Sequence, residues 1–144
     1  MHTLTMGTIQ SQYLEAEILG ADPVKLTALL YRGALDAVAN SRRHLASGDI
    51  RERSRRITQA YEILLELSHT LDHKAGGEIS RNLAELYFYM QNRLIDANAQ
   101  QTDAPLAEVE KLLASLSEAW SAVPFAQTHV SVSEEEYSPV SYTG

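Results

Sequence analysis

Hydrophobic residues in the middle of the chain recur every three or four positions, which is the spacing of one face of an α-helix. In the first such stretch the recurring positions are apolar or small: Leu26, Leu30, Gly33, Ala37, Ser41 and Leu45. Asp22 and Pro23 precede it and are typical of a helix start, because Asp caps free N–H groups and Pro fits the first turn. Gly48 and Asp49 follow it and predict the end of this helix and the cap of the next.

The second stretch has the most regular pattern, with apolar residues spaced by seven and partner positions between them. These residues are Ile50, Ile57, Ala60, Leu64, Leu67 and Leu71. A heptad of this kind predicts packing at a shallow angle against other helices. The predicted helix ends near the sequence HKAGGE, where Gly76 and Gly77 predict a turn.

Two further helices are predicted after this turn. One runs from about Glu78 to Asn98, and its expected core positions, flanked by Tyr87, are Ile79, Leu83, Leu86, Met90, Leu94 and Ala97. The sequence TDAP then repeats the combination of a capping residue and a proline. The apolar stripe of the last helix comprises Leu106, Val109, Leu113, Leu116, Trp120 and Val123.

The connections between these four amphipathic segments are short, so sequential helices are expected to be antiparallel neighbours. The chain is therefore predicted to be all-α, an up-down-up-down four-helix bundle over residues 22–123. Residues 1–21 are predicted to form an N-terminal arm with a short amphipathic helix, because apolar residues recur in it. Residues 124–144 are rich in Ser, Thr and Glu without periodicity and are predicted to be a disordered acidic tail.

The predicted third helix has more apolar residues than one core face needs. In the sequence AELYFYMQNRLIDAN, large apolar or aromatic side chains occupy every position from Leu86 to Met90, and consecutive positions cover the whole helix circumference. Phe88 and Ile95 lie on a second line beside the core stripe, and Tyr89 lies on a third. These three residues are candidates for contact with a partner. The alternative is that Phe88 and Ile95 only widen the core stripe.

Composition excludes several classes of function. The chain has 144 residues, a formal net charge of −7 and no cysteine, which excludes disulfides, thiolate catalysis and Cys-ligated zinc. The acidic balance argues against nucleic acid as a partner. The longest apolar runs are far too short for membrane insertion, and no secretory signal is recognisable at the N-terminus. We therefore expect a cytoplasmic protein.

A cluster of arginines falls between Arg42 and Arg56, with Asp49 and Glu52 as the acidic residues in the same stretch. One interpretation is a basic end of the bundle that meets an acidic partner. The favoured interpretation is solvated helix ends, with Arg42 and Arg43 facing the dipole at a helix C-terminus.

Metal and catalytic signatures are weak. Glu66 and His69 form one Glu-x-x-His motif of the kind found in di-iron bundles, but the heptad places both on the outer face and no second motif exists. His69 and His73 have metal-binding spacing but lack further ligands, so surface histidines are favoured. No phosphate-binding glycine loop or nucleophile motif is present. We expect no cofactor, no metal and no enzymatic activity.

Four segments of the chain resemble the FliS family of flagellin export chaperones in their order and spacing. They are ADPVKLTALLYRGAL, GDI, LLELSHTLDHKAGGEISRNLAELYFYMQNRLIDAN and LAEVEKLLASLSEAW, and the resemblance extends from about Tyr13 to Trp120. The chain departs from the family pattern at four positions. Asp22 stands in place of Ser, Arg32 and Phe88 each stand in place of Asp, and Asn92 stands in place of Arg.

The resemblance implies a cytoplasmic helical bundle that binds the C-terminal segment of newly made flagellin. That segment would be disordered alone and become helical in hydrophobic grooves on the bundle, so that premature polymerisation is prevented. The resemblance also implies delivery to the flagellar type III export apparatus through an export gate component, and it leaves room for other flagellar regulators as partners. A different class of function remains open, namely a self-associating helical scaffold or adaptor that does not bind flagellin.

The candidate partner-binding residues lie on the arm, on the predicted first three helices and along the apolar surplus. They are Ile9, Tyr13, Ile18, Tyr31, Ile63, Leu65, Tyr87, Phe88, Tyr89, Arg93, Ile95 and Asn98. The three arm residues are expected to cover an empty groove and to be displaced when flagellin binds. In the family the arm's tyrosine is also linked to export-gate docking, and Tyr13 is the approximate match.

Overall fold

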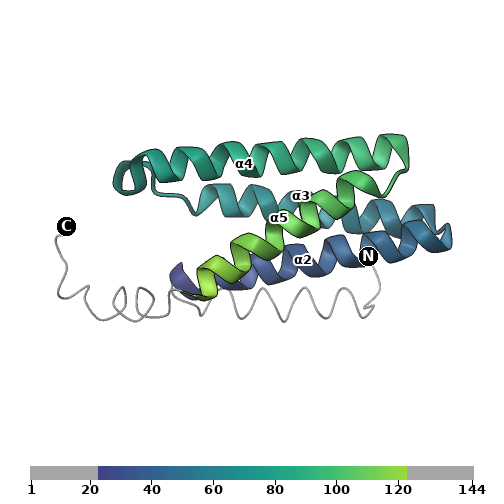
Figure 1. Ribbon diagram of the computed structural model, residues 1–144, viewed down its shortest axis with the longest axis horizontal. Helices are drawn as coiled ribbons and strands as arrows, with labels where there is room; N and C mark the ends of the chain where they lie inside the picture. Colours follow the sequence, from purple (N-terminus) through teal and green to yellow (C-terminus); the bar gives the residue numbers. More distant parts are fainter. Residues whose placement is uncertain (1–22, 123–144) are drawn as a thin grey trace, which may run out of the picture.

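The computed structural model describes residues 23–122, and within this range the chain forms four α-helices (Figure 1). Helix α2 spans Pro23–Ser47, α3 spans Ile50–His69, α4 spans His73–Gln100 and α5 spans Ala104–Ser121. The prediction of an all-α fold is confirmed. The expected arm and acidic tail, with Ile9, Tyr13 and Ile18, lie outside the described residues.

The four helices close into a ring. Helix α2 packs against α3 and α5, and α4 packs against the same two helices. The chain runs along α2, back along α3, out again along α4 and back along α5 (Figure 1). The predicted up-down-up-down topology is therefore confirmed. Helix α5 runs obliquely, starting beside the end of α4 and finishing beside the start of α2 (Figure 1).

Local sequence signals determine most helix ends. Gly48 has a φ of 79°, a left-handed conformation that glycine adopts without steric cost, and it ends α2 as predicted. The Asp49 carboxylate then accepts a hydrogen bond of 3.1 Å from the backbone N–H of Glu52 and caps α3.

The turn predicted at the glycine pair is present, but α4 begins earlier than expected. The Asp72 carboxylate accepts hydrogen bonds from the N–H groups of Lys74 and Ala75, so a first turn forms before the glycines. Gly77 then interrupts the helix with φ 55° and ψ −127°. The uninterrupted part of α4 begins at Glu78, as the sequence predicted.

The start of α5 was predicted correctly, but the prediction that Asp103 caps it is wrong. Pro105 lies in the first turn as predicted, but the Asp103 side chain makes no capping hydrogen bond. Instead, its carboxylate accepts hydrogen bonds of 2.7 Å and 2.8 Å from Nε and Nη2 of Arg42 on α2. This charge-assisted pair with two contacts ties the start of α5 to α2.

The core comprises apolar side chains from all four helices. Its buried members on the predicted stripes are Leu30, Ala37, Ile57, Ala60, Leu64, Leu67, Met90, Leu94, Ala97, Leu106, Val109 and Leu113. Two predicted core residues are exposed, Ile50 at 57 % and Ile79 at 70 %. Both lie near the start of a helix at an end of the bundle, and α4 extends beyond the end of α3 at its start (Figure 1). The periodicity is helical there, but no neighbouring helix reaches these side chains.

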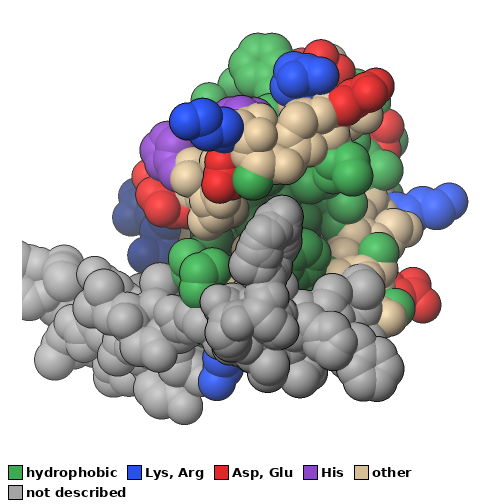
Figure 2. Space-filling model, turned by 90° about the vertical axis from the view of Figure 1, so that its left-hand side faces the viewer, with side chains coloured by type: hydrophobic (Ala, Val, Ile, Leu, Met, Phe, Trp, Pro, Cys, Tyr) green, Lys and Arg blue, Asp and Glu red, His purple; other side chains and the backbone are tan. Residues whose placement is uncertain are grey.

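Hydrophobic side chains also gather at one end of the bundle. Figure 2 looks onto the end where α4 begins and α5 ends, and it shows hydrophobic side chains gathered between charged ones. Leu71, Leu83 and Trp120 belong to the segments that meet here, and all three are only partly buried against the core. Partly buried hydrophobic side chains therefore lie at this end as well as along the sides of the bundle.

Candidate partner-binding surface

A groove of about 330 Å³ runs between α3 and α4. It is lined by Ile57, Thr58, Tyr61, Ile95, Asn98 and Ala99, which we call the α3–α4 groove. Two of the candidate contact residues, Ile95 and Asn98, are therefore part of one recess. Its walls are mostly apolar, and half of the Ile95 side chain is exposed there, at 50 %.

The apolar surface continues beyond the groove in the direction of the start of α4. The pairing of the two antiparallel helices follows from two hydrogen bonds, Ser54 Oγ to Asn98 Oδ1 and Gln91 Nε2 to the carbonyl of Tyr61. By this register Leu65 of α3 lies opposite the turn of α4 that contains Phe88. Leu65 is 43 % exposed and Phe88 is 64 % exposed. Together they extend the groove as an apolar strip.

This arrangement decides between the two interpretations of the apolar surplus on α4. Phe88 and Ile95 are among the most exposed large hydrophobic residues in the described part of the chain, so they do not widen the core stripe. They lie seven positions apart on the side of α4 that faces α3. Large apolar side chains left in solvent along one line are a feature of surfaces that a partner covers.

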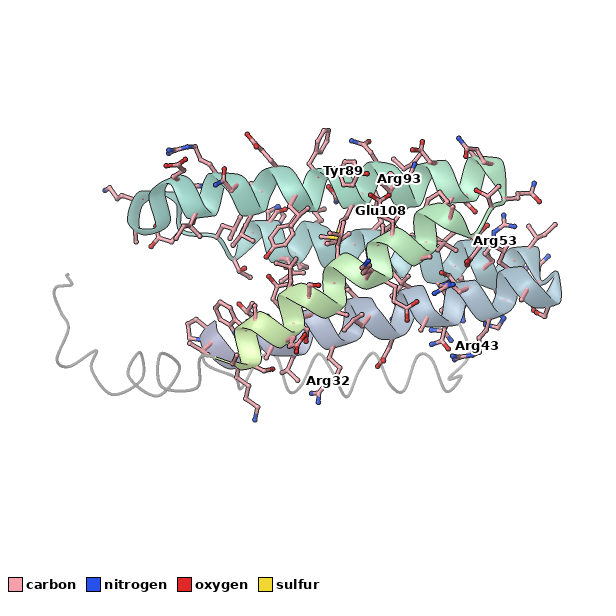
Figure 3. The ribbon with its side chains drawn as sticks, in the orientation of Figure 1. Arg32, Arg43, Arg53, Tyr89, Arg93 and Glu108 are labelled. Carbon is pink, nitrogen blue, oxygen red and sulfur yellow. The ribbon has the colours of Figure 1, made fainter. Side chains whose placement is uncertain are left out.

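The third candidate on this helix, Tyr89, lies on the opposite side, where α4 meets α5. Its hydroxyl donates a 2.6 Å hydrogen bond to Oε2 of Glu108, and Arg93 Nε donates one of 2.7 Å to Oε1 of the same carboxylate. Figure 3 shows both α4 side chains converging on Glu108 of α5. Arg93 also bonds Asp96 through Nη1 at 3.2 Å. Tyr89 and Arg93 are thus engaged within the protein.

The shared hydrogen bonds change the ionisation of this cluster. The bonds from Tyr89 and Arg93 hold the pKa of Glu108 below its ordinary value. The same carboxylate raises the pKa of Tyr89 and that of Arg93. At neutral pH the cluster is therefore a neutral phenol and a guanidinium sharing one carboxylate, which joins α4 to α5.

Two candidate residues are placed in the core, which corrects their assignment as contact residues. Tyr31 and Tyr87 are buried, and their hydroxyl oxygens lie 2.6 Å apart in a hydrogen bond. Helical periodicity placed Tyr87 only at the flank of the core stripe, but the bond to Tyr31 satisfies its polar end and allows full burial. Ile63 is partly buried against the core.

A second groove, not anticipated from the sequence, lies between α2 and α5 and has a volume of about 310 Å³. Its lining includes Leu29, Leu35 and Ser117 with the charged residues Lys25, Arg32 and Asp36. Arg32 is one of the departures from the family pattern, and Figure 3 shows it pointing away from the bundle. Sequence reasoning missed this groove because it depends on the oblique path of α5.

The arginine cluster is split between structural and solvated roles. Arg43 and Arg51 are exposed, as the favoured interpretation expected. Arg42 has a structural role, since it binds Asp103 and also Glu110, the latter at 2.6 Å. Arg53 is buried, at 4 % exposed, and its Nη2 donates to Asn98 Oδ1 at 3.1 Å.

The Glu-x-x-His motif lies on the surface, as the heptad predicted. Glu66 and His69 are both exposed, and Nδ1 of His69 lies 3.9 Å from Oε2 of Glu66. Within residues 23–122 no group of three or more potential ligands is arranged to hold a metal ion. In the same range no helix is long and apolar enough to cross a membrane.

Comparison with known proteins identifies the family. The sequence model of the family described as "Flagellar protein FliS" matches residues 6–127. The chain belongs to the FliS family. The recognised motifs from Tyr13 to Trp120 fall inside this range.

Relatives within the FliS family share about a third of their residues with this chain. The Flagellar secretion chaperone FliS of Salmonella typhimurium is 36 % identical over 111 residues, which cover 76 % of this chain and 82 % of that protein. Flagellar secretion chaperone FliSB of Pseudomonas aeruginosa is 34 % identical over 118 residues, which cover 82 % of this chain and 94 % of that protein. The Flagellar secretion chaperone FliS of Bacillus subtilis is 30 % identical over 108 residues, which cover 75 % of this chain and 80 % of that protein.

Proposed function

We propose that this protein is a cytoplasmic flagellar secretion chaperone that binds the C-terminal segment of flagellin. Its membership of the FliS family and the names of its relatives support this assignment. The structural observation that carries it is the exposed apolar strip of Leu65, Phe88 and Ile95 along the α3–α4 groove.

The groove suits a helical ligand. An amphipathic helix lays its apolar face into a groove between two helices through anchors at helical spacing, and the strip offers contacts for such anchors over two turns of α4. Covering the exposed part of each large side chain is worth about 1–2 kcal/mol. A segment that folds on binding loses ordering entropy, which offsets part of this gain and permits later release.

The proposed role follows from this binding mode. A flagellin segment held in the groove cannot form the contacts of the filament, so the chaperone prevents premature polymerisation. The complex then delivers the subunit to the flagellar type III export apparatus through an export gate component. Binding and release need no covalent chemistry and no cofactor.

Substitution of Ile95 by Asp tests this proposal, because it places a charge in the groove. Since loss of one anchor costs about 1.4 kcal/mol or more, we expect Ile95→Asp to weaken binding of a flagellin C-terminal peptide at least tenfold. Isothermal titration calorimetry measures the affinity. Unfolding stability should change little, because Ile95 is half exposed.

The matched control is Ile79→Asp, which makes the same chemical change on the same helix. Ile79 is exposed near the start of α4, away from the groove. We expect it to bind the peptide as the unmodified protein does. Equal binding by both variants and the unmodified protein would exclude the α3–α4 groove as the flagellin site.

A further inference from the structure

Next to Asn98, at one end of the α3–α4 groove, lies a buried arginine that has no acidic partner among the described residues. Arg53 is 4 % exposed, and no carboxylate within residues 23–122 lies within 4.0 Å of its guanidinium. In this described part of the chain its Nε is buried without a hydrogen-bond partner, and its guanidinium makes one hydrogen bond, from Nη2 to Asn98. Arginine stays protonated under all ordinary conditions, and a buried charge is costly unless it is paired.

Asn98 connects this charge to the groove. Its Oδ1 accepts hydrogen bonds from Arg53 Nη2 at 3.1 Å and from Ser54 Oγ at 2.9 Å. Because the guanidinium can only donate, these bonds fix which side of the amide carries the oxygen. The Nδ2 group is thereby turned away from Arg53. Among the described residues it has no hydrogen-bond partner, and Asn98 itself lines the groove.

Within residues 23–122, the carboxylates nearest to Arg53 in the sequence have other partners, Asp49 among them as the cap of α3. Glu52, in the turn before Arg53, is already paired with Arg55 at 3.2 Å. On α4, Asp96 is paired with Arg93 on the side that faces α5. Asn98 therefore lines the end of the groove with its amide oxygen bonded to a buried cation, and its N–H donors remain available to a ligand (Figure 3 marks Arg53).

We propose that the Asn98 end of the groove binds a carboxylate of the partner segment. The carboxylate accepts a hydrogen bond from Asn98 Nδ2 and compensates the charge of Arg53 through the amide. This inference rests on the proposed function, since the partner segment is the flagellin C-terminal segment that occupies the groove. The proposed site adds one polar contact to a mostly apolar groove. Such a contact fixes the direction and register of a bound helix.

Asn98→Asp separates recognition from folding. The new carboxylate lies where Oδ1 already bonds Arg53, so it pairs with the buried guanidinium and repels a carboxylate in the groove. We expect a melting temperature equal to or above that of the unmodified protein, together with at least tenfold weaker binding of a flagellin C-terminal peptide. Differential scanning calorimetry and isothermal titration calorimetry give the two values.

Asn82→Asp is the matched control. It makes the same charge change on the same helix, at an exposed position outside the groove lining and on the side of α4 that carries Tyr89. Its affinity should stay within about twofold of the unmodified protein, because it lies more than a Debye length from Asn98 and exposed charges at such a distance are screened. If Asn98→Asp binds like Asn82→Asp, or loses stability and affinity together, the carboxylate site is wrong.

The peptide side of the experiment identifies the source of the carboxylate. One peptide has an amidated C-terminus, and others have single Asp→Asn or Glu→Gln replacements. We expect one of these changes to weaken binding to the unmodified protein about tenfold and to have little effect on binding to Asn98→Asp. If no peptide shows this coupling, the inference fails while the proposed function stands. If no peptide binds the unmodified protein, the proposed function itself fails.

Discussion

The hydroxyl groups of Tyr31 and Tyr87 form one buried hydrogen bond of 2.6 Å between α2 and α4, two helices that lie diagonally across the bundle. The rings meet edge to face, with centroids 6.5 Å apart and planes at 61°. Burial raises the pKa of both phenols, so both stay neutral at physiological pH. At the scale of single residues, each hydroxyl is satisfied only by the other among the described contacts.

A double-mutant cycle tests this pair. Tyr87→Phe leaves the Tyr31 hydroxyl buried without its partner, and we expect a loss of about 1–3 kcal/mol in unfolding free energy, as for Tyr31→Phe. The double variant should lose less than the sum of the two, because no orphaned hydroxyl remains. Urea denaturation measures the three values, and strictly additive losses would show that the bond contributes nothing specific.

At the scale of elements, helix α4 has three sides, and each side has a different environment. One side packs in the core through Met90 and Leu94, a second meets α5 through Glu108, and a third borders the α3–α4 groove. The contact with α5 is electrostatic at its surface, which makes it dependent on pH. The groove side is lined mostly by apolar side chains.

The α4–α5 contact should weaken in acid. The folded-state pKa of Glu108 is below its ordinary value of about 4.3, so its stabilising effect is fully present above that value. The effect is lost as the pH falls through the lower folded-state pKa. We therefore expect Glu108→Gln to lower the melting temperature at pH 7 and to have progressively less effect below about pH 4. A difference in melting temperature that is independent of pH would contradict this assignment.

At the scale of the whole molecule, exposed apolar surface coexists with a formal net charge of −7. Mutual repulsion favours separate molecules in solution, whereas the apolar strip favours association. A chaperone that receives a client segment needs this strip to be free. A self-associating scaffold would instead use it for a second copy of the chain.

Sedimentation velocity distinguishes these two functions. For the chaperone we expect a monomer that forms a 1:1 complex with a flagellin C-terminal peptide. Ile95→Asp should remain a monomer and lose the complex. A stable dimer that is insensitive to the peptide and is dissociated by Ile95→Asp would favour the scaffold.

Helix positions and much of the candidate site were predictable from the sequence because they depend on local rules. Gly48, Asp49 and Gly77 end, cap and interrupt helices through backbone geometry that neighbouring residues do not alter. The second line of apolar residues on α4 was visible as a periodicity, and Phe88 and Ile95 were named from it. Whether that line lies in the core or on the surface depends on how much of it α3 covers. The periodicity of one helix carries no information about this.

The sequence by itself determined the four helices, the antiparallel order and the family, because spacing, caps and short connections are properties of the chain. Tertiary structure alone decided the pairing of distant polar groups. Tyr31 with Tyr87, Arg42 with Asp103 and Arg53 with Asn98 are each 45 or more positions apart, and their contacts depend on the packing of separate helices. For this reason Tyr31 and Tyr87 were named as candidate partner contacts although both are buried, and the buried charge next to the groove emerged only from the fold.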